Sequence, residues 1–272
     1  MESGFDLQPI EKLRKDLRQA TALLSVEEIR YSVDLYYQIQ EFRKAAANQV
    51  RALLGDKKPV NLLGWTLTSM ETVEKEIKQG LEIYTEHEPT GMGAWAKSIC
   101  GIGPVLSAGL LAHIEIKKAP TVGHIWRFAG LDPTSEWKKG QKRPWNAALK
   151  VLTWKIGESF VKVSGNRADI YGKIWLERKA HETAKNDNYE FREQADNALA
   201  RRKIGKETEA YKAYSIGKLP PAHIHARAKR YAVKLFLSHW WEEAYRRHFG
   251  KAPPLPYPIA MLGHSHWIRF SH

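Results

Sequence analysis

Apolar residues recur every three or four positions over most of this chain, which is the spacing of amphipathic helices. Residues 9–54 carry this pattern, with a break at Leu24–Val26, where Ser25 and Glu28 have the spacing of a capping box. A second helix is expected from about Thr68 to Thr85. Together the two segments predict an antiparallel helical hairpin or coiled-coil arm, whose apolar stripe would serve packing or pairing into a homodimer.

The rest of the chain also predicts helices, without a convincing run of alternating strand residues. After a linker at 87–93 and a compact central part, a polar helix is expected at about 167–185. A charged stretch then runs to Lys218, and a final strong helix is expected at about 222–249. The fold class is therefore mainly α, with an N-terminal arm, a central domain and a C-terminal helical region that ends in a proline-rich tail. The predicted domain ranges are 1–90, 91–165 and 166–272.

The most specific motif is Gly101-Ile102-Gly103-Pro104, which lies between two apolar segments. Glycine permits positive φ in a tight hairpin and lets the main chain approach a phosphate. Ile102 would plug the hairpin into the core, and Pro104 suits the first turn of a second helix. The free N–H groups from Val105 onward would hold a phosphate oxygen. The motif predicts a helix-hairpin-helix that grips backbone phosphate without reading bases; a plain glycine turn between core helices is the alternative.

Charge narrows the class of partner. The 272 residues include 43 Lys and Arg against 30 Asp and Glu, a formal net charge of +13 at pH 7. Such an excess favours nucleic acid, with an anionic membrane or a generic basic surface as alternatives. Cys100 is the only cysteine, which excludes an intrachain disulfide and fits a reducing cytoplasm. No apolar run is long enough to predict a membrane span, and the acidic first residues do not predict a signal peptide.

The cations are concentrated in two stretches. Residues 138–155 contain no acid, and three tryptophans are interleaved with their cations. Cations hold phosphate and indoles stack on unpaired bases, although packing is the alternative for the tryptophans. A second basic run from Arg201 to Lys234 would follow a duplex backbone or form a solvated helix face. The first stretch comprises Lys138, Lys139, Lys142, Arg143, Lys150 and Lys155 with Trp137, Trp145 and Trp154, and its loop is expected beside the hairpin.

A second motif, Phe128-Ala129-Gly130-Leu131-Asp132-Pro133, follows the first. The pair resembles the C-terminal domain of the insertion-sequence transposases that join a RuvC-like DEDD domain to a helix-hairpin-helix domain, a family that includes recombinases guided by a bridge RNA. The resemblance covers about residues 95–160 and implies DNA binding, with RNA as a further partner. The preceding residues predict helices instead of the RuvC-like sheet with its acidic metal ligands. The resemblance thus favours a shortened, non-cleaving relative on a prokaryotic or phage mobile element, located with the nucleoid in the cytoplasm.

The same resemblance implies a catalytic serine shortly after the second motif, usually next to a glycine. Here Lys138 and Lys139 precede Gly140, and Ser135 is displaced from that position. Ser135 is the candidate nucleophile of an active recombinase or nuclease, with the neighbouring lysines stabilising charge on the phosphodiester. The alternative is a turn serine that precedes a basic loop.

Two His-x-His pairs, His223 with His225 and His264 with His266, are weak candidates for a divalent metal site. Hydrogen bonding, phosphate contacts or pinning the tail against the last helix are the alternatives. No other cofactor is expected. Three functions therefore remain open on the sequence: a nucleic-acid-binding protein, an active recombinase or nuclease, and an interaction protein for an acidic partner.

Overall fold

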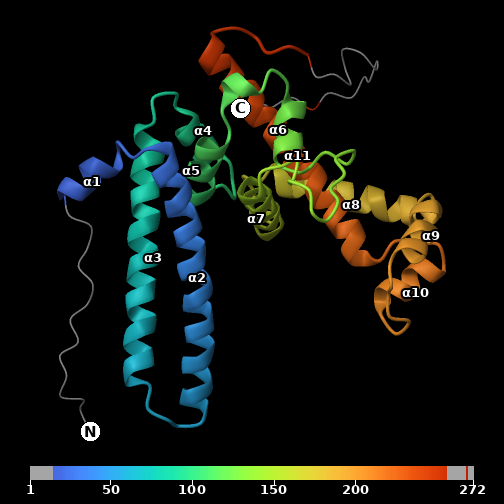
Figure 1. Ribbon diagram of the computed structural model, residues 1–272, viewed down its shortest axis with the longest axis horizontal. Coiled ribbons are helices and arrows are strands. Elements are labelled where there is room, and N and C mark those ends of the chain that lie inside the picture. The colour runs from blue at the N-terminus through green and yellow to red at the C-terminus, as the bar shows by residue number, and fades with distance from the viewer. Residues whose placement is uncertain (1–14, 256–267, 269–272) are drawn as a thin grey trace. The chain divides into compact units, whose positions relative to one another are not determined.

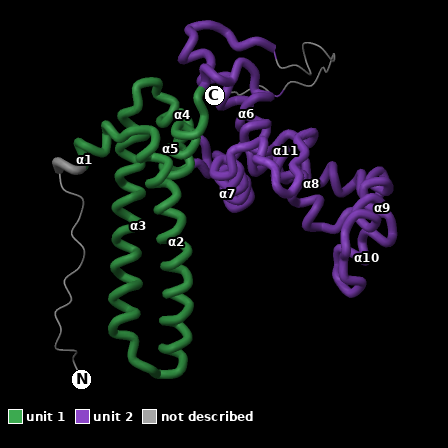
Figure 2. The backbone as a smooth tube through the Cα atoms, viewed as in Figure 1, with its two compact units in different colours: residues 1–98, 103–115 green, residues 99–102, 116–272 purple. Residues whose placement is uncertain are grey.

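The structure is a computed structural model that describes residues 15–255 and 268 (Figure 1). The described residues form helices and no β-strand, which confirms the mainly α prediction. Their contacts group them into two compact units (Figure 2), one of residues 1–98 with 103–115 and the other of residues 99–102 with 116–272. The three domain ranges drawn from the sequence stay a prediction. In the described part, no helix has both the length and the apolar character needed to cross a membrane.

The first unit is dominated by the predicted arm. After the short helix α1 (Lys15–Thr21), α2 (Val26–Gly55) and α3 (Asn61–His87) form an antiparallel pair joined at one end (Figure 1). Ser25 Oγ accepts a hydrogen bond from the N–H of Glu28 at 3.2 Å, which confirms the cap at the predicted break. α3 begins at Asn61, well before the predicted Thr68.

Polar contacts join the two arm helices where the apolar seam is only half-buried. The carboxylate of Glu74 on α3 accepts hydrogen bonds from Arg43 and Gln40 on α2, the latter at 3.0 Å. Fully buried apolar side chains, such as Ile29 and Leu81, lie near the base of the arm. There α5 (Pro104–His113) packs against both α2 and α3. The packing role predicted for the arm is thus visible within one chain, and the homodimer stays a prediction.

The predicted linker at 87–93 is shorter than expected, because its last two residues begin a helix. α4 (Met92–Ser98) starts with Met92 and Gly93 buried. The turn before it is held by Glu88, whose carboxylate accepts hydrogen bonds from the N–H groups of Thr90 at 3.0 Å and Gly93 at 2.9 Å. The glycines that suggested a linker therefore serve a tight turn and a close helix contact.

The second unit is built around its longest helix, α11 (Pro221–Phe249), which ends at Gly250 in the left-handed conformation. α11 contacts α6 (Val122–Phe128), α7 (Ala147–Val163) and α8 (Tyr171–Asp187), and also the 3-10 turn η1 (Ile116–Lys118). The rings of Phe160, Tyr171 and Phe236 meet in its core, with centroids 4.9 to 5.4 Å apart. Trp241 Nε1 donates a hydrogen bond to the carbonyl of Ala119 at 2.8 Å.

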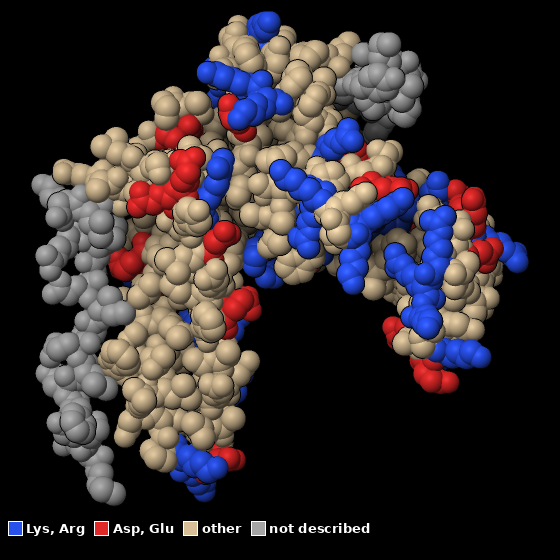
Figure 3. Space-filling model, in the orientation of Figure 1, with Lys and Arg blue, Asp and Glu red and all other residues tan. Residues whose placement is uncertain are grey.

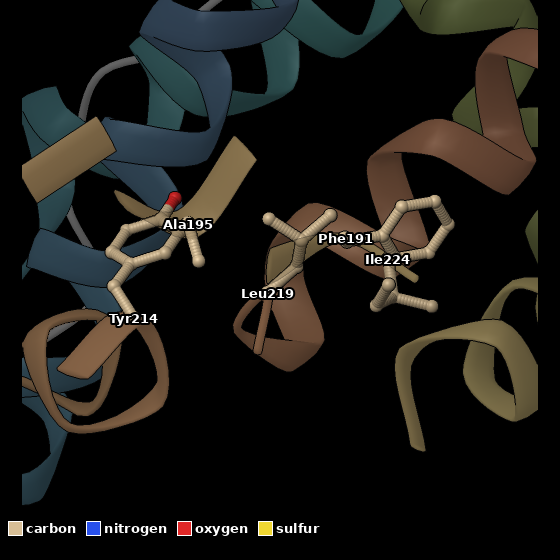
Figure 4. Close-up of a cluster of buried hydrophobic side chains, with 5 residues drawn as sticks. All are labelled: Phe191, Ala195, Tyr214, Leu219 and Ile224. Atoms are coloured by element: carbon tan, nitrogen blue, oxygen red, sulfur yellow. The ribbon is translucent and has the colours of Figure 1, made fainter. Parts of the chain in front are cut away.

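The charged stretch before Lys218 contains two helices that the sequence pattern did not reveal, α9 (Arg192–Arg201) and α10 (Glu209–Ser215). They enclose a small apolar cluster with the start of α11 (Figure 4). The Asn186 side chain fixes the segment that leads to α11, because its amide both donates to and accepts from the backbone of Leu219, at 2.9 and 2.8 Å. The cluster comprises Phe191, Ala195, Tyr214, Leu219 and Ile224.

Candidate nucleic-acid interface

The predicted hairpin turn lies between α4 and α5. The N–H of Ile102 donates to the carbonyl of Ile99 at 2.9 Å, which closes the turn. Gly101 has φ +93°, the left-handed geometry that favours glycine. The side chain of Ile102 is only 4% exposed, which confirms that it plugs the turn into apolar surroundings. The turn therefore has the predicted geometry at its first two positions.

Gly101 is required by the fold. A Cβ at this position would lie 3.2 Å from Val163, 3.3 Å from Ser159 and 3.4 Å from Phe160, all on the last turns of α7. Ser159 Oγ donates a hydrogen bond of 2.5 Å to the Gly101 carbonyl. Backbone conformation and close packing together explain this glycine without any ligand.

Gly103 differs from the expectation, because its φ of −89° and ψ of 178° are ordinary extended values. It is the N-cap residue of α5, it is exposed, and a Cβ there would have nothing within 4 Å. Positive φ is therefore not the reason for this second glycine. Neither positive φ nor internal packing requires this glycine, and glycine is a favourable residue at an N-cap.

The first turn of α5 presents unused N–H groups. Its first helical hydrogen bond runs from the N–H of Ser107 to the carbonyl of Gly103 at 3.0 Å. The N–H groups of Val105 and Leu106 thus precede the first helical donor, and Pro104 has no N–H. Val105 and Leu106 as whole residues are only 6% and 8% exposed, whereas Gly103 at the N-cap is exposed. This is the arrangement by which a helix start holds an oxygen of a phosphate.

The basic loop between α6 and α7 contains a built turn. The N–H of Gln141 donates to the carbonyl of Lys138 at 3.1 Å, and Gly140 has φ +90°, which is typical of the third position of a type II turn. Trp137 Nε1 donates to the carbonyl of Gln141 at 2.7 Å, and the Arg143 guanidinium lies 5.3 Å from the centroid of the Trp137 ring. The loop is thereby ordered around one tryptophan.

The candidate phosphate-binding cations of this region are exposed. The four cations of the loop are Lys138, Lys139, Lys142 and Arg143. Among the described residues, no ion pair joins them to a carboxylate. Lys150, which follows on α7, lies 4.0 Å from the ring centroid of Trp145. In the second basic run, Lys218 and Arg227 are paired with Asp187 and Glu182, and the surface over α9 and α10 shows Lys and Arg interspersed with Asp and Glu (Figure 3). The loop thus leaves more uncompensated positive charge at the surface than the second run does.

The loop and the hairpin turn meet different ends of α7. Asn146 caps the start of this helix by accepting from the N–H of Leu149 at 2.9 Å, directly after the loop. Gly101 packs against the other end, at Phe160. At a rise of 1.5 Å per residue, these two anchor points lie roughly 20 Å apart along the helix. The end of the loop and the glycine of the turn therefore lie at opposite ends of α7.

Two of the three interleaved tryptophans are surface residues. Trp137 is 40% exposed and Trp154 is 57% exposed, whereas Trp145 is half-buried. On α7, the ring centroid of Trp154 lies 5.2 Å from the amine of Lys229, and that amine is itself paired with Glu158. Core packing therefore does not account for the rings of Trp137 and Trp154.

Ser135 lies in a turn that Asp132 organises. Ser135 Oγ donates to one Asp132 oxygen at 3.3 Å, and the other oxygen accepts from the N–H and the hydroxyl of Thr134 at 2.9 and 2.7 Å. The hydrogen bond from the Thr134 backbone holds the pKa of Asp132 below its usual range. A carboxylate with a lowered pKa is a weak general base, so this geometry favours the turn-serine interpretation over a nucleophile.

His223 and His225 do not converge. They lie two positions apart on the first turns of α11, and so point about 200° apart around the helix. His223 Nδ1 lies 3.4 Å from the Tyr214 hydroxyl, and the His225 ring meets the Trp175 ring at 5.3 Å between centroids. Within the described ranges, no cluster of three or more His, Cys, Asp or Glu could hold a metal ion. The other pair, His264 and His266, lies outside the described residues.

His239 contacts the tail. Its Nε2 donates to the carbonyl of Ile268 at 2.8 Å, since a carbonyl can only accept, and its Nδ1 then accepts from the Tyr171 hydroxyl at 2.8 Å. Burial lowers the pKa of His239 more than the hydrogen bond to Ile268 raises it, which favours this neutral form. His239 on α11 therefore holds the backbone of Ile268.

Mild acid is expected to destabilise the fold. The pKa values of four histidines are lowered, with burial as the largest cause in each case. The unfolded chain then binds more protons than the folded one below about pH 6.5, so stability falls as pH drops from 7.5 to 5.5. Urea unfolding at both pH values measures the difference, and equal midpoints would contradict this expectation. The four are His113 in the first unit and His223, His225 and His239 in the second.

One buried charge cluster was not predicted from the sequence. Glu182 on α8 is 2% exposed and forms ion pairs with Arg178 at 2.5 Å and with Arg227 on α11 at 2.8 Å. The four-residue spacing of Arg178 and Glu182 is a signal for the first pair. The second pair depends on how α8 and α11 pack, which the sequence does not state.

Comparison with known proteins adds no relative to this picture. No model of a protein family, no curated protein and no solved structure matches the chain.

Proposed function

We propose that this protein binds nucleic acid, with DNA as the first candidate and RNA as the second. The start of α5 would hold a backbone phosphate against Gly103 and the N–H groups of Val105 and Leu106. The observation that carries the proposal is Gly103 itself, a glycine with ordinary dihedral angles and open space at the start of a ten-residue helix. The net charge of +13 supports an anionic ligand.

The proposal also covers the family and the process. A shortened relative of the helix-hairpin-helix transposases, acting in the cytoplasm on DNA of a mobile element, would bind without cleaving. The hydrogen bond from Ser135 to Asp132 supports this non-cleaving form, because it gives the serine a turn role and no strong base. An incubation with supercoiled plasmid and Mg²⁺ should leave the DNA intact; nicking that Ser135→Ala abolishes would establish the recombinase or nuclease instead.

Gly103→Asp and its isosteric control Gly103→Asn test the phosphate site. Asp and Asn are equally good N-cap residues, so both variants should fold at least as stably as the original protein. The aspartate would place a negative charge against the phosphate, whereas asparagine adds the same volume without charge. We expect Gly103→Asp to bind at least about tenfold more weakly than Gly103→Asn, as two anions close together at a desolvated contact cost more than about 1.4 kcal/mol.

The measurement is fluorescence anisotropy with labelled duplex DNA, single-stranded DNA and RNA over a salt series, with circular dichroism to verify folding. Binding by the original protein should weaken steeply with salt, because cations displace counterions from the backbone. Equal affinities of the Asp and Asn variants would remove the start of α5 from the interface. Weak binding of every ligand by the original protein would overturn the nucleic-acid proposal and favour an acidic protein partner.

A further inference from the structure

The partly exposed residue Trp137 offers a contact to a base, in addition to the contacts that cations make with phosphates. We infer that the turn Trp137–Arg143 is a stacking platform for an unpaired base of DNA or RNA. This inference rests on the proposed function, because it names the form of nucleic acid that the basic loop takes. A helix start that holds phosphate accepts duplex and single strand alike, whereas an open indole face distinguishes them.

The Trp137 ring is fixed before any ligand arrives. Its Nε1 is bound to the carbonyl of Gln141, and the type II turn at Gly140 brings that carbonyl back toward the ring. Arg143 lies against the ring at 5.3 Å from its centroid, yet Trp137 as a whole residue is 40% exposed. A base that stacks on the exposed part of the ring therefore meets a side chain that loses little freedom on binding, which favours affinity.

The surroundings of the ring carry the charge that a nucleotide requires. Lys138 and Lys139 occupy the first two positions of the turn, and Lys142 follows it. Within the described part of the chain, no ion pair connects these three amines to a carboxylate. A phosphate joined to the stacked base would thus find cations on the same short loop. This combination of an aromatic platform with uncompensated cations is typical of proteins that bind single strands.

The ligand must be unpaired for a geometric reason. In a duplex, both faces of every internal base are covered by its neighbours, so an indole can stack only on a base at an end or one that has left the stack. Single strands, loops and junctions offer such bases. The loop would then select unpaired bases, whereas the start of α5 would bind the backbone of paired and unpaired strands alike.

Trp137→Leu and Trp137→Phe test this inference. Leucine removes the aromatic face, whereas phenylalanine keeps a ring but loses the Nε1 hydrogen bond. We expect Trp137→Leu to weaken binding of a twelve-nucleotide oligo-dT or oligo-U by about tenfold, and to weaken binding of a blunt duplex of equal length by less than about twofold. Trp137→Phe should stay within about threefold of the original protein on the single strands. Comparing oligo-dT with oligo-U shows which sugar the site prefers.

Trp65→Leu is the matched control, since it removes an indole of nearly equal exposure from α3, outside the basic loop. It should leave the single-strand preference unchanged. An equal loss on duplex and single strand in Trp137→Leu, or no loss on either, would overturn the stacking platform. Failure of the proposed function looks different, because the original protein itself would then bind every ligand weakly. Failure of the phosphate site alone would make Gly103→Asp match Gly103→Asn on every ligand while Trp137→Leu still distinguished single strand from duplex.

Discussion

Replacing Glu182 with glutamine is expected to lower the free energy of unfolding of the second unit by about 2–3 kcal/mol. The carboxylate is buried and is paired with two guanidinium groups, those of Arg178 and Arg227. Removing one partner of a buried ion pair leaves uncompensated charge, which costs roughly 3–5 kcal/mol when the remaining charge is fully desolvated. The two arginines are partly exposed, so solvent reduces that cost.

The same cluster predicts a dependence on pH. Burial by itself would raise the pKa of Glu182, but the hydrogen bonds from Arg227 and Arg178 outweigh it and the pKa lies below its usual value. A lowered carboxyl pKa contributes stability above the unfolded value of about 4.3, and this contribution is lost as pH falls through the folded value. The difference between the original protein and Glu182→Gln should therefore be largest near neutral pH and shrink in acid.

Urea unfolding followed by tryptophan fluorescence at pH 7 and pH 4 measures this difference. Glu190→Gln is a suitable control in the same unit, because its pair with Lys185 is largely exposed and should contribute less than about 1 kcal/mol. Equal midpoints for the original protein and Glu182→Gln at pH 7 would show that the cluster does not stabilise the unit.

Local patterns explain which parts of the fold the sequence could predict. The capped start of α2, the two arm helices and the limits of α11 follow from side-chain periodicity and from residues such as Ser25 and Gly250. α9 and α10 were not predicted, because each buries few side chains and their stability comes from the cluster around Phe191 and Tyr214. Contacts between residues distant in sequence decide such short helices, and no local pattern reports them.

The candidate site shows more clearly that local sequence patterns do not report contacts in three dimensions. Gly101 and Gly103 are the same residue type two positions apart, but only Gly101 has positive φ and close neighbours. The sequence predicts the turn, and the structure is needed to tell which glycine the fold requires and which one leaves a space. In the same way, the spacing of His223 and His225 in the sequence resembles that of a metal-binding pair. In the structure they lie on a helix, where His223 contacts Tyr214 and His225 contacts Trp175.

Gly93→Ala, at the start of α4, is expected to be the most damaging small substitution in the segment formed by α4, the turn and α5. A Cβ on Gly93 would overlap the backbone carbonyl of Thr85 on α3, and backbone cannot move aside as a flexible side chain can. The Gly93 carbonyl also accepts a hydrogen bond of 3.1 Å from Ser107 Oγ, which ties α4 to α5. Alanine gains roughly 1 kcal/mol in helix propensity, but the overlap should exceed it and leave a net loss of at least about 2 kcal/mol.

The matched control is the same substitution at Gly103, where a Cβ meets nothing within 4 Å. Gly103→Ala should change the free energy of unfolding by less than about 1 kcal/mol, the cost of a poorer N-cap. Thermal unfolding followed by circular dichroism compares the two variants. If Gly93→Ala proved as stable as Gly103→Ala, the contact between α3 and α4 could not be as close as described. The expected result is that Gly93→Ala lowers stability, while Gly103→Ala alone weakens DNA binding in the folded state. Gly93 would then be required by the fold and Gly103 by the ligand.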